Sequence, residues 1–254
     1  MTSILTSKRA LKYLSFVLVF SLWEIAGRVP ISPAFPPFSE TMVGLWEMIV
    51  DGSMVRAFAN TLQPLALGIL VSGVLGVAIG IWMGLSRRVE WFGFPVFIVA
   101  QAAPLAALIP LLVLAYGIGL TSKVLVVAIM AMPVIVLNTL NGVRSTQTSL
   151  IEMGTAFLGT RRDIILKIIL PSASPIIFAG LRLGISAGFI GAILAELLIT
   201  PTGVGDLITY AQSRADYAKM YAAIFSIIAV AVISLDLLEK LEQNWLRPDR
   251  KGAR

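Results

Sequence analysis

The run TLQPLALGILVSGVLGVAIGIWMGL, residues 61–85, contains no charged side chain. A helix needs about 18 or more predominantly apolar residues to cross the hydrocarbon core of a bilayer, and this run is long enough. A helix of that length on the surface of a soluble protein would carry a charged face toward water, and this one has none. The run therefore predicts a transmembrane helix and indicates a membrane protein.

The composition of the whole chain agrees with this prediction. The chain has 254 residues, of which 57% are hydrophobic and only 13% charged, whereas soluble domains are about 45–50% apolar and about 25% charged. A soluble enzyme domain, a coiled coil and a disordered chain do not fit these values. The absence of Cys and His removes thiolate and imidazole metal sites and catalysis by a Ser–His or Cys–His pair.

Six apolar segments recur along the chain, and they predict an all-α membrane protein with six transmembrane helices. Each can cross about 30 Å of hydrocarbon at about 1.5 Å per residue. Segments of about ten residues with alternating hydrophobicity, which would indicate a barrel, are not present. The predicted spans are residues 11–27, 61–85, 91–115, 123–143, 175–200 and 218–238.

The distribution of positive charge predicts the orientation of these spans. With a cytoplasmic N-terminus, 14 of the 20 Lys and Arg residues lie in inside segments, five lie outside, and Arg182 lies within the fifth span. Cytoplasmic loops of membrane proteins are enriched in Lys and Arg. Both termini are therefore predicted to be cytoplasmic, and the net charge of +6 needs no nucleic-acid partner.

Two segments outside the spans carry further information, and the first is residues 28–60, which this topology places outside. A Pro-rich turn, Pro30 to Pro37, precedes apolar residues at helical spacing, which predict an amphipathic helix that rests on lipid or contacts an extracytoplasmic partner. We expect an N-terminal segment 1–60, a five-span core 61–240 and a basic cytoplasmic tail 241–254. The apolar residues of the predicted amphipathic helix are Phe38, Met42, Leu45, Trp46 and Ile49.

The second segment is the longest predicted cytoplasmic connection, residues 144–174. Ser149 precedes Glu152 by three residues, the spacing of a capping box, which predicts a helix that starts near Leu150. Pro171 and Pro175 should end that helix before the fifth span. The expected element is a cytoplasmic helix at about 149–170, a ready surface for another protein.

Glycines recur at intervals of four residues in the second and fifth spans. Such faces allow helix backbones to approach closely in lipid. We prefer the interpretation that they pack within one subunit, and pairing between subunits stays open. The glycines are Gly76, Gly80, Gly84, Gly180, Gly184 and Gly188.

The cytoplasmic connection resembles the EAA loop of binding-protein-dependent ABC importer permeases. That motif has a Glu with two small residues, then a Gly, then an Ile-x-Leu-Pro ending. Here Met153 replaces the first small residue, and Gly159 stands one place later than the usual Gly. The matching residues are Glu152, Met153, Gly154, Gly159, Ile168, Leu170 and Pro171.

Other stretches, in the same order along the chain, resemble permeases of the nitrate/sulfonate/taurine type. Together with the loop they extend the resemblance over about residues 60–240, nearly the whole core. These stretches are 101–104, 116–119, 138–139, 142–144, 195–196 and 203–208.

The resemblance implies a permease subunit of the prokaryotic cytoplasmic (inner) membrane that pairs with a second copy, as a homodimer. Two ABC ATPase subunits would bind ATP and Mg on the cytoplasmic side, consistent with the absence of a GxxxxGK[ST] motif in this chain. An extracytoplasmic binding protein would deliver a small solute such as a sulfonate, taurine or nitrate, although the subfamily also imports pyrimidine-type precursors. This chain itself would hold no catalytic residue, cofactor or metal.

The resemblance also implies that the EAA loop forms a coupling helix on the ATPase. The implied coupling residues are Glu152, Met153, Gly154, Gly159, Leu170 and Pro171.

Two charged residues lie within the fifth span, where charges are costly and often functional. Arg182 extends its side chain to the headgroups or faces a pore or partner, and Glu196 lines a translocation path or caps the turn 203–205. Two rival classes remain. A self-sufficient secondary transporter or channel predicts ion-coupling residues at mid-membrane, and an intramembrane enzyme predicts clustered catalytic groups at one depth.

Overall fold

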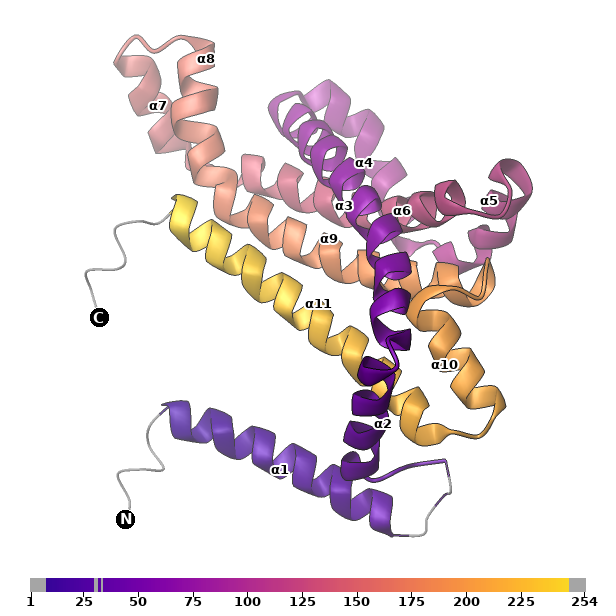
Figure 1. Ribbon diagram of the computed structural model, residues 1–254. Coiled ribbons are helices and arrows are strands. Elements are labelled where there is room, and N and C mark those ends of the chain that lie inside the picture. The colour runs from indigo at the N-terminus through magenta and orange to yellow at the C-terminus, as the bar shows by residue number, and fades with distance from the viewer. Residues whose placement is uncertain (1–7, 30–31, 33, 247–254) are drawn as a thin grey trace. The chain divides into compact units, whose positions relative to one another are not determined.

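The computed structural model describes residues 8–29, 32 and 34–246. Throughout these residues the regular structure is helical and contains no strand (Figure 1). Most of the predicted basic tail 241–254 lies outside the described residues, as do Pro30 and Pro33 of the predicted Pro-rich turn. The all-α prediction is confirmed.

The chain divides into two compact units. Among the described residues, the first consists of those up to 59 together with 202–228, and the second of 60–201 together with those from 229 onward. Two long helices, α3 (Ser53–Leu85) and α11 (Tyr217–Leu246), contribute to both.

An aromatic cluster holds the first unit together. It joins α1 (Lys8–Arg28) to α2 (Phe38–Val50) and to the start of α11. The ring of Phe38 lies 4.6 Å from that of Phe20, 5.4 Å from that of Trp23 and 6.1 Å from that of Phe225, measured between centroids. Offset and edge-on aromatic pairs at such separations add stabilisation beyond the area they bury. The helix α10 (Gly203–Ser213) completes this unit.

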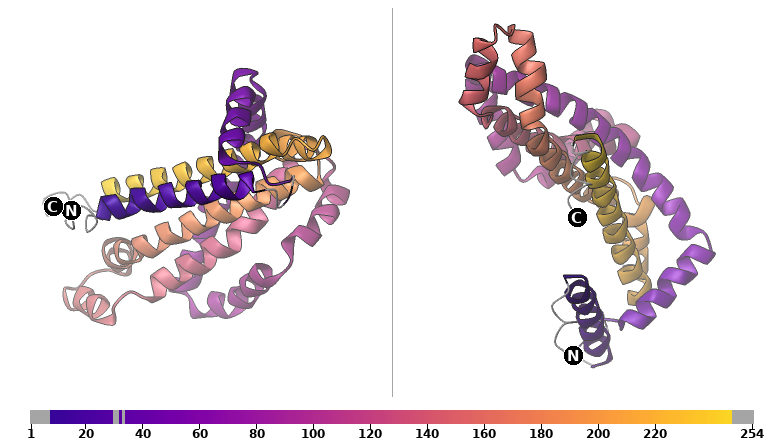
Figure 2. Two further views of the ribbon diagram at one scale, coloured as in Figure 1. Left: turned by 90° about the horizontal axis from the view of Figure 1, so that it is seen from below. Right: turned by 90° about the vertical axis from the view of Figure 1, so that its left-hand side faces the viewer.

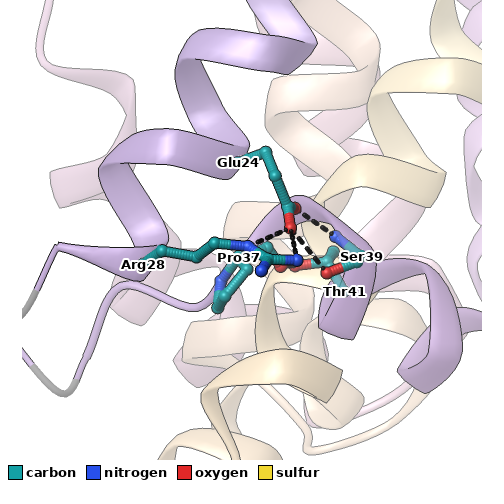
Figure 3. Close-up of polar contacts among 5 residues, drawn as sticks. All are labelled: Glu24, Arg28, Pro37, Ser39 and Thr41. Atoms are coloured by element: carbon teal, nitrogen blue, oxygen red, sulfur yellow. Dashed lines mark hydrogen bonds and ion pairs between the residues drawn. The ribbon is translucent and has the colours of Figure 1, made fainter.

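The carboxylate of Glu24 on α1 caps the N-terminus of α2 (Figure 3). It accepts hydrogen bonds from the Ser39 backbone N–H at 2.9 Å and from the Ser39 hydroxyl at 3.0 Å. The Arg28 Nε donates to the same carboxylate at 2.7 Å. A negative charge at this position also interacts favourably with the dipole of α2, so α1 fixes the direction in which the chain enters α2.

The predicted amphipathic helix is α2, and its packed side consists of Thr41, Gly44 and Met48. A Cβ added at Gly44 would lie 3.3 Å from the Ala218 backbone, so a small residue lets α2 approach the start of α11. Trp46, one of the apolar residues that predicted the helix, stays 67% exposed. It remains available to lipid or to a partner protein.

The second unit is built around α6 (Leu120–Arg144), which is buried along most of its length. Its core includes Met83, Val136 and Leu140, and further along it Val143 and Ala173. The long helix α9 (Leu170–Leu198) runs beside α6 (Figure 2). The remaining elements of this unit are α4 (Arg87–Ala102), η1 (Leu105–Leu108), α5 (Ile109–Tyr116), α7 (Thr148–Ala156), α8 (Arg161–Ile164) and η2 (Ile165–Ile169).

The glycines that recur every four residues in α3 and in α9, here called the two glycine ladders, both face α6. The prediction that they pack helices within one subunit is therefore confirmed. A Cβ added at Gly80 of α3 would lie 2.5 Å from the Cβ of Thr139, and one added at Gly184 of α9 would lie 2.4 Å from Cγ1 of Ile135. Real Cβ atoms do not approach so closely, and only glycine permits these helix contacts. In lipid, where burying a Leu gains little, such contacts are the main source of helix association.

Four helices are long and apolar enough to cross a membrane: Ser53–Leu85, Leu120–Arg144, Arg161–Leu198 and Tyr217–Gln243. A fifth span is formed if the pair Arg87–Ala102 and Ala106–Tyr116, bent by 88°, is counted as one. These counts cover the described part of the chain, in which the predicted first span lies in α1. The six-span topology and the cytoplasmic termini stay predictions.

Replacing Gly80 with alanine should destabilise the second unit. The new Cβ would meet Thr139 and also the Val136 carbonyl oxygen, at 2.7 Å, so the helices would have to separate. Overpacking of this kind costs about 1–3 kcal/mol. We expect a lower midpoint of thermal unfolding for the detergent-solubilised protein.

Gly73→Ala, in the same helix, is the matched control. Its Cβ would meet only the Leu181 Cδ2 atom, at an ordinary 3.6 Å. An equal loss of stability in both variants would contradict close packing as the cause.

Candidate functional site

The coupling segment predicted from the sequence forms a helical hairpin at one end of α9 (Figure 1). Its first arm is α7, and its second arm is α8 followed by η2. The second arm continues into α9 without a break, so one helix runs from Arg161 to Leu198. The expected single helix at about 149–170 is therefore wrong, because a turn at residues 157–160 divides that stretch.

The predicted capping box at Ser149 and Glu152 does not form. The N-cap of α7 is Gln147, whose side chain makes no capping hydrogen bond. The helix begins at Thr148, so Ser149 already lies within it and cannot act as the N-cap. Glu152 is exposed on α7, which leaves its carboxylate free for a role other than capping.

The end of α7 is a Schellman motif. The Leu158 N–H donates to the Thr155 carbonyl at 2.9 Å, and the Gly159 N–H donates to the Gly154 carbonyl at 3.0 Å. Leu158 takes the left-handed conformation, with φ of 57°. Glycine usually occupies this position, which explains why the Gly of the family motif normally stands one place earlier than Gly159.

A capping box does form at the start of α8. The Asp163 N–H donates to the Thr160 hydroxyl at 3.2 Å, and the Thr160 N–H donates back to the Asp163 carboxylate at 3.2 Å. The signal, Thr-x-x-Asp, was present in the sequence and was missed. The Asp163 carboxylate also forms an ion pair with Lys167 at 2.6 Å.

Gly154 allows the two arms of the hairpin to touch, and Gly159 allows the tight turn between them. A Cβ added at Gly154 would lie 2.5 Å from Cδ1 of Ile168, and one added at Gly159 would lie 2.8 Å from the Gly154 carbonyl oxygen. Residues that lie up to 14 positions apart in the motif are therefore packed together. The spacing of the motif residues along the chain therefore fits a hairpin rather than one straight helix.

The Leu170–Pro171 step does not end the helix, contrary to the prediction. Instead the Leu170 N–H donates to the carbonyl of Ile165, five residues earlier, which is a π-type bond. Pro171 follows at once and has no N–H to donate. The wider π turn lies where the Pro171 ring meets the preceding turn, and the helix continues through Pro171 and on through Pro175.

The hairpin exposes an apolar tip between its arms, which the sequence reasoning missed. Phe157 is 82% exposed and Leu158 is 91% exposed. Glu152 and Met153 are exposed on the adjoining arm α7. We call Phe157 and Leu158 the tip. Its exposed apolar side chains beside a carboxylate form a surface suited to a protein partner.

The charged residues of the fifth span both have partners within the second unit. Arg182 forms an ion pair with Glu242 of α11, whose side chain is only 8% exposed. Glu196 is 1% exposed and accepts a hydrogen bond from the Thr61 hydroxyl at 2.6 Å. Both partners are distant in the sequence, so no local pattern indicated them. The proposed role of Arg182 and Glu196 in a translocation path stays a prediction.

The family model described as "Binding-protein-dependent transport system inner membrane component" matches residues 76–251. The chain belongs to this family, and the resemblance found in its motifs is confirmed.

Relatives and a solved structure agree with this assignment. The taurine transport system permease protein TauC of Escherichia coli (strain K12) is 29% identical over 91% of this chain and 86% of its own. The formylaminopyrimidine transport permease protein ThiX of Halalkalibacterium halodurans is 28% identical over 94% of this chain and 95% of its own. The structure of the inward-facing MetNI methionine ABC transporter has a similar fold, with a TM-score of 0.57, 20% identity, and coverage of 74% of this chain and 94% of that chain.

Thr160→Ala should loosen the hairpin, whereas Ser149→Ala should not. The first removes a capping box, which is worth on the order of 1 kcal/mol, and the second removes a hydroxyl that caps nothing. Hydrogen exchange should show faster exchange of the amides of residues 161–164 in Thr160→Ala only. Faster exchange at the start of α7 in Ser149→Ala would restore the original capping prediction.

Proposed function

We propose that this chain is the membrane-spanning subunit of an ATP-driven importer and that its hairpin docks on a separate ABC ATPase. The observation that supports this most directly is the hairpin itself. Its arms are packed through Gly154 and Ile168, while Glu152, Met153 and the tip remain exposed. A preorganised element with an exposed apolar end loses little conformational entropy on binding.

The proposed assembly contains two copies of this chain as a homodimer in the cytoplasmic (inner) membrane of a prokaryote. The ATPase subunits supply ATP and Mg, and an extracytoplasmic binding protein delivers the cargo. The permease core of residues 61–240 crosses the membrane, with six spans in the whole chain and both termini in the cytoplasm. This proposal extends the family membership and the charge distribution of the sequence.

The cargo is a small organic or inorganic anion of the sulfonate, taurine or nitrate type. A relative named for taurine supports this class. A relative of nearly equal identity is named for formylaminopyrimidine, so identity alone does not select the solute. In this proposal the separate binding protein selects the cargo, and the permease supplies the path.

The helical connection between the hairpin and the membrane suggests how energy reaches the path. The second arm of the hairpin continues through the π turn into α9 without a flexible linker. Movement of the docked hairpin would therefore move α9 directly. Closure of the ATPase subunits on ATP would pull the two permease copies from inward-open to outward-open, and hydrolysis would reset them.

Changing the tip should weaken the bound ATPase. We propose the double change Phe157→Ser and Leu158→Asn, because asparagine tolerates the left-handed conformation of residue 158. Loss of such anchors at an interface should reduce ATPase binding by about tenfold or more. The measurement is the amount of ATPase recovered, and its hydrolysis rate, after affinity purification from native membranes in mild detergent.

Glu152→Ala should also reduce recovery of the ATPase, and Glu40→Ala is the control. Glu40 lies in the first turn of α2, on the side that the topology predicts to be outside. Equal recovery from all of these variants would exclude the hairpin as the docking site. Recovery of the chain without any ATPase would favour a self-sufficient transporter or channel.

Single cysteines should report opposite sides of the membrane for the hairpin and for α2. The chain has no native Cys, so each introduced thiol is unique. In intact cells, a membrane-impermeant maleimide should label Trp46→Cys and should not label Phe157→Cys until the membrane is permeabilised. Labelling of both in intact cells would overturn the proposed topology.

A further inference from the structure

A buried charge cluster lies in the second unit, and the proposed function does not use it. We define it as Thr61, Lys123 and Glu196, which belong to α3, α6 and α9. Their exposed fractions are 0%, 7% and 1%. Glu196 lies near the end of α9 that is remote from the hairpin, and Lys123 lies in the first turn of α6.

The carboxylate of Glu196 is hydrogen-bonded to α3 and attracts a buried positive charge on α6. The Thr61 hydroxyl donates to Oε1 of Glu196 at 2.6 Å, across 135 positions of sequence. The charge of Lys123 interacts with that of Glu196. A hydrogen bond to a charged group is stronger than one between neutral groups, so the Thr61 contact ties α3 to the end of α9.

The cost of burying these charges makes the cluster sensitive to the loss of one member. Moving two charges out of water is expensive, and their attraction offsets part of that cost only while both are present. Removing one partner leaves an uncompensated buried charge, whereas replacing both by apolar residues is often tolerated. This asymmetry distinguishes a charge pair from two residues that happen to be adjacent.

The position of the cluster on α9 connects it to the hairpin. The continuous helix Arg161–Leu198 has 38 residues and at about 1.5 Å per residue extends roughly 57 Å. The capped start of α8 lies at one end and Glu196 lies near the other. Between them, Gly184 and Gly191 keep α9 against α6.

We propose that the buried charge cluster anchors the far end of α9 to α3 and α6, so that a displacement applied at the hairpin moves the three helices as one body. Thr61, Lys123 and Glu196 are then positioning residues for transport rather than residues that line the path. Their burial agrees with this role, because no member is open to solvent in this structure. The inference rests on the proposed function.

The test uses the permease purified with its ATPase and a single cysteine at Leu120, the first residue of α6, which is 42% exposed. The labelling rate of this cysteine by a maleimide is measured with and without ATP and Mg. We expect ATP to change that rate when the cluster is intact. In Lys123→Met and in Glu196→Met the ATP-dependent change should fall by about fivefold or more, while the rate of ATP hydrolysis stays within about twofold.

The double variant Lys123→Met/Glu196→Met should recover both the response to ATP and the midpoint of thermal unfolding. A purely structural role would lower the yield of folded complex without separating hydrolysis from movement. If neither single variant folds, Thr61→Val supplies a milder test, because it removes only the hydrogen bond. We expect it to weaken the response.

Thr139→Val is the matched control for Thr61→Val. Thr139 is also fully buried, but its hydroxyl has no hydrogen-bond partner in the described structure. This variant should respond to ATP as the parent does.

Two results would overturn the inference while leaving the proposed function in place. One is an unaltered response in all cluster variants, and the other is a parent complex that hydrolyses ATP without any change at Leu120. A purified chain that retains no ATPase would instead overturn the proposed function.

Discussion

The close approach of α3 and α9 to α6 is the constraint on which the second unit depends. In lipid, apolar side chains gain little by packing together, so helices associate where their backbones can come near each other. Gly80 allows α3 to come close to α6, and Gly184 does the same for α9. Once α9 is held against α6, the position of everything continuous with α9 follows, and this includes the second arm of the hairpin.

The hairpin shows how a sequence motif can record a three-dimensional contact. Gly154 meets Ile168 because the chain reverses at Leu158 and Gly159, and the reversal is stabilised by a Schellman motif and a capping box. Leu158 accepts a left-handed backbone that glycine would adopt at less cost. Its side chain is almost fully exposed. A docking role for the tip accounts for a leucine at this position.

Two ion pairs of the second unit join one helix to another. Arg144 pairs with Glu90, and Arg182 pairs with Glu242. Together with the buried charge cluster, these contacts join the helices. The apolar surfaces of those helices do not by themselves select one relative orientation, because apolar contacts are not directional. Polar contacts of this kind specify which residues face each other, while the glycines determine how near the helices lie. The proposed movement of α9 as part of one body depends on both.

The sequence by itself determined the class of the protein, its long apolar helical segments, its family and the preferred use of the glycine ladders. Apolar run length, charge bias and residue spacing are local properties. Only the tertiary structure decided which Ser or Thr caps a helix, since Ser149 and Thr160 have similar local patterns but different backbone conformations. It also decided that the helix continues through Pro171, which depends on a π turn that no composition rule predicts. The partners of Arg182 and Glu196 come from segments distant in the sequence. Such contacts form only when the folded chain brings those segments together.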